Sequence, residues 1–324
     1  MKSAKSLIKN YYDTLSRIIH ESWAVVLPKS YVKYLYRRTM HEELNIKNPR
    51  DYNEKLEWLK LYSDISLWTN CADKYNVRDY IIQCGLGHIL VDLYGVWRDA
   101  NDMEFNKLPD RFVLKSTHGF GKTILVKDKS QLDIDKTKNQ LNDWLKVRYG
   151  LVTFEPHAWK INRQIIAEEL LYDNYNASLS SSLIDYKFWC IHGEPQVIVA
   201  MANRENTVIG TNEKSCNLKF QYFAYDLNWN FRPEIHGSRH TRDNNAVLPR
   251  PQCLNEMIEI CRILSKPFAT VRVDLYEVNN KVYFGELTFT PGGSRNYFTP
   301  EFFRELGEKI DLSRVELRKG RSII

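Results

Sequence analysis

The sequence of 324 residues lacks the signatures of several protein classes. It has no repeat, no CxxC pair and no uninterrupted apolar run that would predict a membrane span or a signal peptide. Its cysteines indicate neither a zinc site nor a disulfide framework, so we expect reduced thiols in the cytoplasm. The six cysteines are Cys71, Cys84, Cys190, Cys216, Cys253 and Cys261.

The charge of the chain is nearly balanced. Its 46 Lys and Arg and 40 Asp and Glu give a net charge of +6. That excess is too small to indicate a nucleic-acid partner, but it agrees with an anionic substrate or weak contact with a membrane surface. With 43% hydrophobic and 13% aromatic residues, the composition predicts a soluble globular protein with one large core or two to three subdomains.

The chain is predicted to be helical up to about residue 70. An apolar stripe in the first helix is typical of a core or an interface rather than of a membrane anchor; it comprises Ile8, Tyr11, Tyr12, Leu15, Ile18 and Ile19. Asp51 and Glu54 have capping-box spacing. The segment DKYNVRDYIIQCG predicts a helix that ends at Gly85. Its Lys74 and Arg78 are either solvated cations or a pair whose repulsion a bound anion offsets.

A glycine-bearing hairpin follows, with strands predicted over 111–115 and 123–127. Gly119 and Gly121 would let backbone N–H groups approach phosphate oxygens, and Lys115 would add a point charge. The loop matches neither GxxxxGK[ST] nor GxGxxG before a helix, so an ordinary turn is the alternative. In the next helix, over 133–149, Asp133 and Asp135 are expected as capping charges.

The middle of the chain predicts further strands and a loop. QIIAEELLYDN reads as a strand whose exposed edge would offer amides to an adenine. A second hairpin turns at residues 192–195 and places Asp185 and Lys187 on one face. The polar segment 203–251 is predicted to be a long loop that forms a substrate lid. A final helix is expected at Thr299 and Pro300, which form an N-cap and first-turn proline.

The segment RVDLYEVNNKVYFGELTFTPGG, residues 272–293, predicts two strands of alternating polarity. A three-residue turn would place Asp274 directly opposite Glu286, whereas a two-residue turn would place them on opposite faces. Two facing carboxylates repel, and Mg²⁺ typically takes one or two carboxylates together with phosphate oxygens. The pattern indicates either a magnesium nucleotide site or an exposed hairpin with scattered charges.

In this order, the basic helix, the lysine strand with its glycine hairpin, the Glu-Glu hinge and the final hairpin resemble the ATP-grasp ligase superfamily. NPRDYNEKLEWLKLY and ADKYNVRDYI resemble its branch for teichuronopeptide and capsular polysaccharide synthesis. The resemblance implies an α+β ATP-grasp fold, in which two α/β subdomains with antiparallel sheets clamp ATP. The subdomains would be residues 71–172 and 173–324, preceded by a helical section over 1–70.

The resemblance also implies roles for individual residues. The ATP-binding residues would be Arg78, Lys115, Ser116, Thr117, His118, Gly119, Gly121, Lys122, Glu168, Glu169, Leu171, Asp185 and Lys187. The Mg²⁺ ligands would be Asp274, Glu286 and Thr288, where many relatives have asparagine in place of the threonine. Arg272 would act with Lys115 in catalysis by steadying an anionic intermediate. Gly292 and Gly293 match the turn that holds the acceptor, and Arg239 and Arg242 are added by charge as contacts of an anionic acceptor.

The activity implied is ATP-dependent ligation of a carboxylate to an amine through an acyl phosphate. By analogy with the branch, the carboxylate would belong to a uronic-acid-containing saccharide or its precursor, and the amine to an amino acid. The enzyme would be cytoplasmic, peripherally associated with a membrane-bound polysaccharide assembly. A glycosyltransferase with Asp133-Ile134-Asp135 as its D-x-D motif, a sugar kinase and a non-catalytic nucleotide-binding module are the alternatives.

Several side chains carry a functional and an ordinary interpretation. His118 would contact phosphate or be solvated, and His236 and His240 would contact an acidic sugar without predicting a metal. Trp189 and Trp229 would stack on a sugar ring or be buried.

Overall fold

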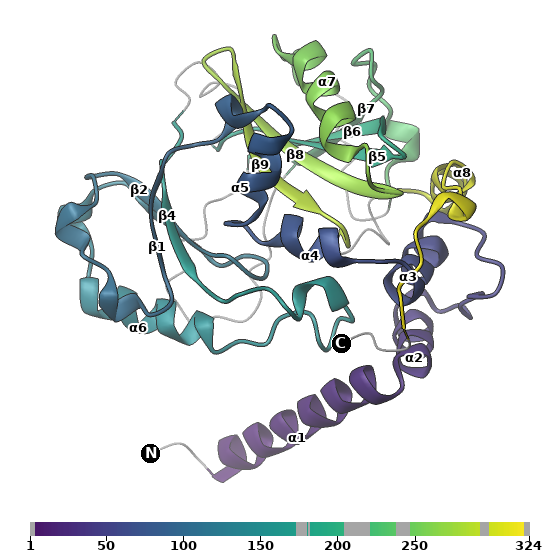
Figure 1. Cartoon of the computed structure of the whole chain (residues 1–324), viewed down its shortest axis with the longest axis horizontal. Helices are drawn as coiled ribbons and strands as arrows, with labels where there is room; N and C mark the ends of the chain where they lie inside the picture. The colour runs from purple at the N-terminus through teal and green to yellow at the C-terminus, as the bar shows by residue number, and fades with distance from the viewer. Residues whose placement is uncertain are drawn as a thin grey trace.

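The computed structural model describes residues 4–172, 180, 182–203, 221–237, 247–291 and 298–320, with side chains from residue 12 onward. Figure 1 shows two antiparallel sheets with helices packed around them and a helical N-terminal section. This arrangement confirms the predicted α+β class. Short 3₁₀ turns lie at Gly87–Ile89, Ala100–Asp102, Phe105–Lys107, Lys129–Gln131, Pro156–Ala158, Pro233–Ile235 and Leu312–Arg314.

The N-terminal section forms α1 (Ala4–Val26), α2 (Pro28–Met40), α3 (Tyr52–Tyr62), α4 (Ser66–Ala72) and α5 (Val77–Gln83). Asp51 caps α3, because its carboxylate accepts a 2.8 Å hydrogen bond from the Glu54 backbone N–H. After α5 the chain passes through Gly85 at φ 77°, a left-handed conformation that glycine adopts without strain. Both helix boundaries confirm the predictions.

The smaller sheet contains β1 (Leu93–Trp97), β2 (Phe112–Ser116), β3 (Thr123–Val126) and β4 (Ile165–Glu168), in the order β1-β4-β2-β3. Helix α6 (Ile134–Leu145) contributes Leu141 and Trp144 to its core and ends before the predicted Tyr149. Strand β4 lies between β1 and β2, so the prediction of an exposed edge there is wrong. Asp133 caps α6 by accepting a hydrogen bond from the Lys136 backbone N–H, which explains the D-x-D spacing without a sugar-nucleotide site.

The larger sheet contains β5 (Asp185–Ile191), β6 (Glu194–Ala202), β7 (Gln221–Tyr225), β8 (Thr270–Val278) and β9 (Lys281–Thr288), in the order β7-β6-β5-β8-β9. Helix α7 (Leu254–Ser265) covers one face, and α8 (Pro300–Glu308) packs against α3 (Figure 1). The prediction of one long loop over 203–251 is wrong, because β7 lies within it and adds an edge strand to the sheet; residues 204–220 and 238–246 lie outside the described part.

The hairpin of β8 and β9 owes its register to a β-bulge. Its turn has only two residues, Asn279 and Asn280, both with positive φ (52° and 58°), as a tight hairpin turn requires. Such a turn would place Asp274 and Glu286 on opposite faces, but the register shifts at Gly285 and brings them directly opposite. The two carboxylates therefore face each other, as expected for a three-residue turn, although the turn has two residues.

The apolar stripe of α1 is not buried in this chain. Leu15, Ile18 and Ile19 are exposed by 42%, 50% and 55%. The helix packs instead through Ala24, which is fully buried, and His20, whose ring lies near those of Trp23, Tyr31 and Tyr34. Of the two predicted roles, core or interface, the core is therefore wrong for these residues, while Ile8 and Tyr11 have no described side chains. No helix in the described ranges combines the length and the apolar character needed to cross a bilayer.

We expect Gly285→Ala to destabilise the protein by about 1–3 kcal/mol, because overpacking forces the backbone to shift. A Cβ at Gly285 would lie 2.8 Å from the backbone oxygen of Asp274. Thermal unfolding of the variant measures the loss. Gly87→Ala is the matched control, since its nearest heavy atom would lie at 3.5 Å; equal melting temperatures for the two variants would contradict the requirement for glycine.

His157 should make stability depend on pH. Its ring lies 6.0 Å from that of Trp68 and 5.9 Å from that of Phe289, and burial lowers its pKa to about 3. The unfolded chain, with an ordinary His pKa of about 6.5, binds more protons between these values, so stability falls as pH decreases through that window. His157→Phe keeps the ring packing and should lose less melting temperature than wild type between about pH 7 and pH 5; identical losses would contradict this.

Candidate active site

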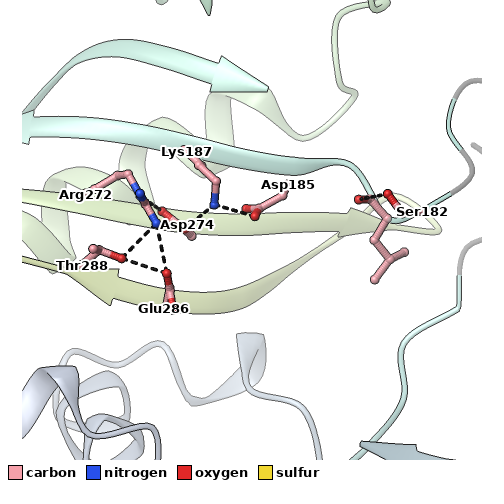
Figure 2. A network of polar contacts seen from close by, with 8 residues as sticks. Ser182, Asp185, Lys187, Arg272, Asp274, Glu286 and Thr288 are labelled. Atoms are coloured by element: carbon pink, nitrogen blue, oxygen red, sulfur yellow. Dashed lines mark hydrogen bonds and ion pairs between the residues drawn. The ribbon is translucent and has the colours of Figure 1, made fainter. Parts of the chain in front are cut away.

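An ion-pair network on β5, β8 and β9 faces the interior of the molecule (Figure 2). Arg272 is its centre: Nε and Nη2 each donate to Asp274 at 2.6 Å, and Nη2 also reaches Glu286 and Thr288 at 3.0 Å. Its guanidinium carbon lies 5.6 Å from the centroid of the Trp189 ring. The planar fork is therefore fixed on several sides, as bidentate recognition requires.

Lys187 links the two acidic residues of neighbouring strands. Its Nζ donates to Asp185 and to Asp274, each at 2.5 Å, and all three side chains are buried. The two carboxylates raise the pKa of Lys187 against the opposing effect of burial, so the amine stays charged. The Oδ1 atom of Asp185 is buried and has no hydrogen-bond partner in the described structure, so it remains an available acceptor.

The oxygen ligands at this network suit Mg²⁺, although not equally. Glu286 has a 39% exposed side chain, and its Oε1 accepts hydrogen bonds from Arg272 and from Thr288. Partial desolvation opposes the shift, but the positive charges of Arg272 and Lys187 lower its pKa to about 2, so it is a carboxylate at neutral pH. Asp274 has both oxygens engaged by Arg272 and Lys187, so a cation would share this carboxylate with them. Within the described ranges no three His, Cys, Asp or Glu side chains form a metal-binding group.

The smaller sheet presents a second charged cluster. Glu168, at the end of β4, accepts from Lys115 at 2.8 Å and from Arg78 at 3.2 Å. The side chain of Glu168 is only 7% exposed, whereas that of Lys115 is 29% exposed. Lys115 is therefore the member of this cluster that can reach a ligand. Arg78 also donates to the Val91 carbonyl at 2.8 Å and its side chain is only 16% exposed, so the alternative of a solvated surface cation is wrong for this residue.

The glycine loop is anchored at its start. Ser116 donates its hydroxyl to the His118 carbonyl at 2.7 Å, and Thr117 donates its hydroxyl to the Asn162 carbonyl at 2.7 Å. His118 is buried rather than solvated, and burial lowers its pKa to about 4, so its ring is neutral at pH 7. Gly119 and Gly121 have φ values of 81° and 71°. These conformations favour glycine and support a loop that can expose backbone N–H groups.

Lys74 belongs to the site, although the sequence analysis assigned it no role of its own. Its Nζ donates to the Gly119 carbonyl at 2.8 Å. Burial lowers its pKa, and the charged groups that act on it include Glu286 as well as Lys115. Buried Asp73 caps the following turn by accepting from the Tyr75 backbone N–H, which fixes the chain beside Lys74. The sequence signal for the fixed position of Lys74 is the DKY segment, in which a capping aspartate precedes the lysine.

Other predicted site residues lie apart from these clusters or are not described. Lys122 lies over the Trp144 ring, 5.5 Å from its centroid. The backbone N–H of Glu169 donates to the Asp92 carbonyl, so that amide is occupied, and Leu171 follows it beyond the end of β4. Buried His236 accepts from the Ala224 backbone N–H, and Trp189 is fully buried. Gly292, Gly293, Arg239, Arg242 and His240 lie outside the described residues.

Comparison with solved structures identifies distant similarities. D-alanine–D-alanine ligase from Bacillus anthracis is 14% identical, with 81% of this chain and 74% of that chain covered and a TM-score of 0.45. The corresponding enzyme from Helicobacter pylori is 12% identical, with 81% and 67% covered and a TM-score of 0.43. L-amino acid ligase from Bacillus licheniformis is 14% identical, with 71% and 45% covered and a TM-score of 0.42.

No curated protein matches the sequence. The sequence model of the family described as TupA-like ATPgrasp matches residues 54–311, which include both sheets and every charged residue of the two clusters. The match extends over well more than half of the chain. This protein therefore belongs to the TupA-like ATP-grasp family.

Proposed function

We propose that this protein is an ATP-dependent carboxylate–amine ligase that forms an amide through an acyl phosphate. ATP-grasp ligases use ATP and Mg²⁺ for this class of reaction. The observation that carries the proposal is the set of charged contacts that the two sheets and the glycine loop provide: Lys74 with the loop, Lys115 with Glu168, and Arg272 with Glu286. A polyphosphate and its counterion would thus meet cations and carboxylates contributed by both sheets.

The residues of the smaller sheet would bind the phosphates of ATP. Lys115 would exchange its contact with Glu168 for a phosphate oxygen, while Arg78 keeps that carboxylate neutralised. The glycine loop would present backbone N–H groups, and Lys74 would hold the loop through the Gly119 carbonyl. Each contact places positive charge where the transferred phosphoryl group carries negative charge.

The residues of the larger sheet would hold the metal and the sugar of the nucleotide. Glu286 would ligate Mg²⁺, with Asp274 and Thr288 completing the protein ligands; when bound, the metal neutralises phosphate charge. The unpartnered Oδ1 of Asp185 would accept from a ribose hydroxyl. The chain that leaves β4 at Glu169 and Leu171 would border the adenine.

Arg272 would stabilise the oxyanion that develops when an amine attacks the acyl phosphate. Its guanidinium is charged at every relevant pH and is held by several partners, so it presents donors without reorganising. The acyl group would then pass to the amine nitrogen, the phosphate would leave, and the amine proton would be released to solvent. The acceptor candidates Gly292, Gly293, Arg239 and Arg242, which lie outside the described residues, would contact the carboxylate substrate.

Within this proposal the carboxylate belongs to a uronic-acid-containing saccharide or precursor, and the amine to an amino acid. The resemblance to polysaccharide-modifying relatives supports this choice, as does the modest positive charge of the chain. The reaction would take place in the cytoplasm, beside a membrane-bound polysaccharide assembly.

Replacing the proposed ligands should abolish turnover. We expect Lys115→Ala and Glu286→Ala each to lower Mg²⁺-dependent ADP release by at least about 100-fold, because the first removes a cation that stabilises the phosphoryl group and the second removes a ligand of the metal that does so. The assay combines ATP with uronic acids or their nucleotide sugars and amino acids, and mass spectrometry identifies an amide. Glu194→Ala, which removes an exposed carboxylate that pairs with Arg262, is the control.

Three outcomes would overturn parts of this proposal. Full turnover by a folded Glu286→Ala protein would refute the metal assignment. A phosphorylated sugar formed without an amine would establish a kinase, and glycosyl transfer without ATP turnover would establish a glycosyltransferase.

Lys74→Met should raise the KM for ATP about tenfold or more, because a charge-assisted contact contributes at least 1.4 kcal/mol in such a site. The melting temperature should not fall, since a buried amine whose pKa is lowered is itself costly to keep charged. Lys107→Met, which changes an exposed lysine paired with Glu104, is the control. An unchanged KM would remove Lys74 from the ATP site.

A further inference from the structure

Helix α1 carries an apolar surface that the rest of the chain leaves uncovered. Leu15, Ile18, Ile19 and Val26 are exposed by 42%, 50%, 55% and 72%, and Leu27 beyond the helix by 58%. At 3.6 residues per turn these helical positions lie on one side. Together these five residues form what we call the α1 apolar face.

The α1 apolar face points away from the helix's own packing contacts. His20 and Ala24, one turn apart, are the positions through which α1 rests on α2, where Tyr31 is fully buried. By helical geometry His20 and Ala24 lie on the side opposite Ile18 and Ile19. Figure 1 shows α1 along the outer edge of the molecule, away from both sheets. An amphipathic helix normally buries its apolar side, so this surface calls for an external partner.

The first 40 residues, which include both α1 and α2, carry the whole net charge of the protein. Residues 1–40 contain eight Lys or Arg and two Asp or Glu, a net charge of +6, which equals that of all 324 residues. The remaining chain is therefore neutral overall. The basic residues are Lys2, Lys5, Lys9, Arg17, Lys29, Lys33, Arg37 and Arg38, and the acidic ones are Asp13 and Glu21.

We infer that α1 is a docking surface for an anionic lipid bilayer, on which it lies in the interface plane, while α2 behind it adds positive charge. The α1 apolar face would enter the boundary between headgroups and acyl chains, and the basic side chains would attract lipid phosphates. The charge argues for lipid over a second copy of this chain, because two segments of +6 would repel each other. The inference does not depend on the proposed ligase activity.

Vesicle co-sedimentation of the full chain tests the inference. We expect binding to phosphatidylcholine vesicles that contain about 30% phosphatidylglycerol, little binding to pure phosphatidylcholine vesicles, and weaker binding at high salt, as electrostatic attraction to lipid requires. Binding to neither kind of vesicle at low salt would overturn the inference.

A pair of matched variants tests the apolar contribution. Ile18→Ser with Ile19→Ser should weaken vesicle binding at least about tenfold, since buried apolar area governs interfacial affinity. Ile263→Ser with Leu317→Ser removes comparably exposed side chains elsewhere, 42% and 57%, and should bind as wild type does. Melting temperatures identify any folding defect.

Two results of the variant experiment would contradict lipid docking. One is equal vesicle binding by the α1 variant and wild type. The other is a wild-type dimer in light scattering that the α1 variant converts to a monomer while no protein binds vesicles, which would assign the α1 apolar face to self-association. Neither result depends on ATP turnover, so the ligase proposal is tested separately.

Discussion

The buried charge network around Arg272 is the constraint on which the candidate site depends. Asp274 is almost inaccessible to solvent, and an isolated carboxylate there would lose its hydration without compensation. Arg272 and Lys187 supply that compensation, and they hold the carboxylate at a fixed place on β8. Breaking a buried pair leaves an uncompensated charge, so these residues act as one unit. The strands fix their positions, and a ligand must fit that arrangement.

The sequence was sufficient for the elements that local patterns control. Alternation gave the paired hairpins, and Asp51, Asp133 and Thr299 begin helices as capping residues because a side-chain acceptor close to free N–H groups is a local signal. That Asp274 and Glu286 face each other was also expected for one of the two turn lengths considered, but the structure achieves it through a β-bulge and not through a three-residue turn. Counting residues in a turn cannot detect a bulge, which depends on how tightly a glycine can approach the neighbouring strand.

Long-range packing explains what the sequence could not provide. Lys74 and Arg78 read as one pair on a helix, yet tertiary contacts separate them, Lys74 to the Gly119 carbonyl and Arg78 to Glu168. The edge status of β4 likewise depends on β1, which precedes it by many residues. Periodicity identified the stripe of α1, but which side of a helix faces its own protein is decided by neighbours such as Tyr31, not by the stripe itself.

The two charged clusters carry net formal charges of opposite sign. On the larger sheet three carboxylates, Asp185, Asp274 and Glu286, meet two cations, Lys187 and Arg272, which leaves a formal excess of one negative charge. On the smaller sheet Glu168 meets Lys115 and Arg78, and Lys74 adds a third cation close to the same loop. A ligand that joins an anionic polyphosphate to a hard cation would complement both net charges: the cation the negative one and the polyphosphate the positive one. Neither cluster alone distinguishes such a ligand from a simple anion or metal ion, so selectivity for a metal–nucleotide complex would require both clusters to contact it.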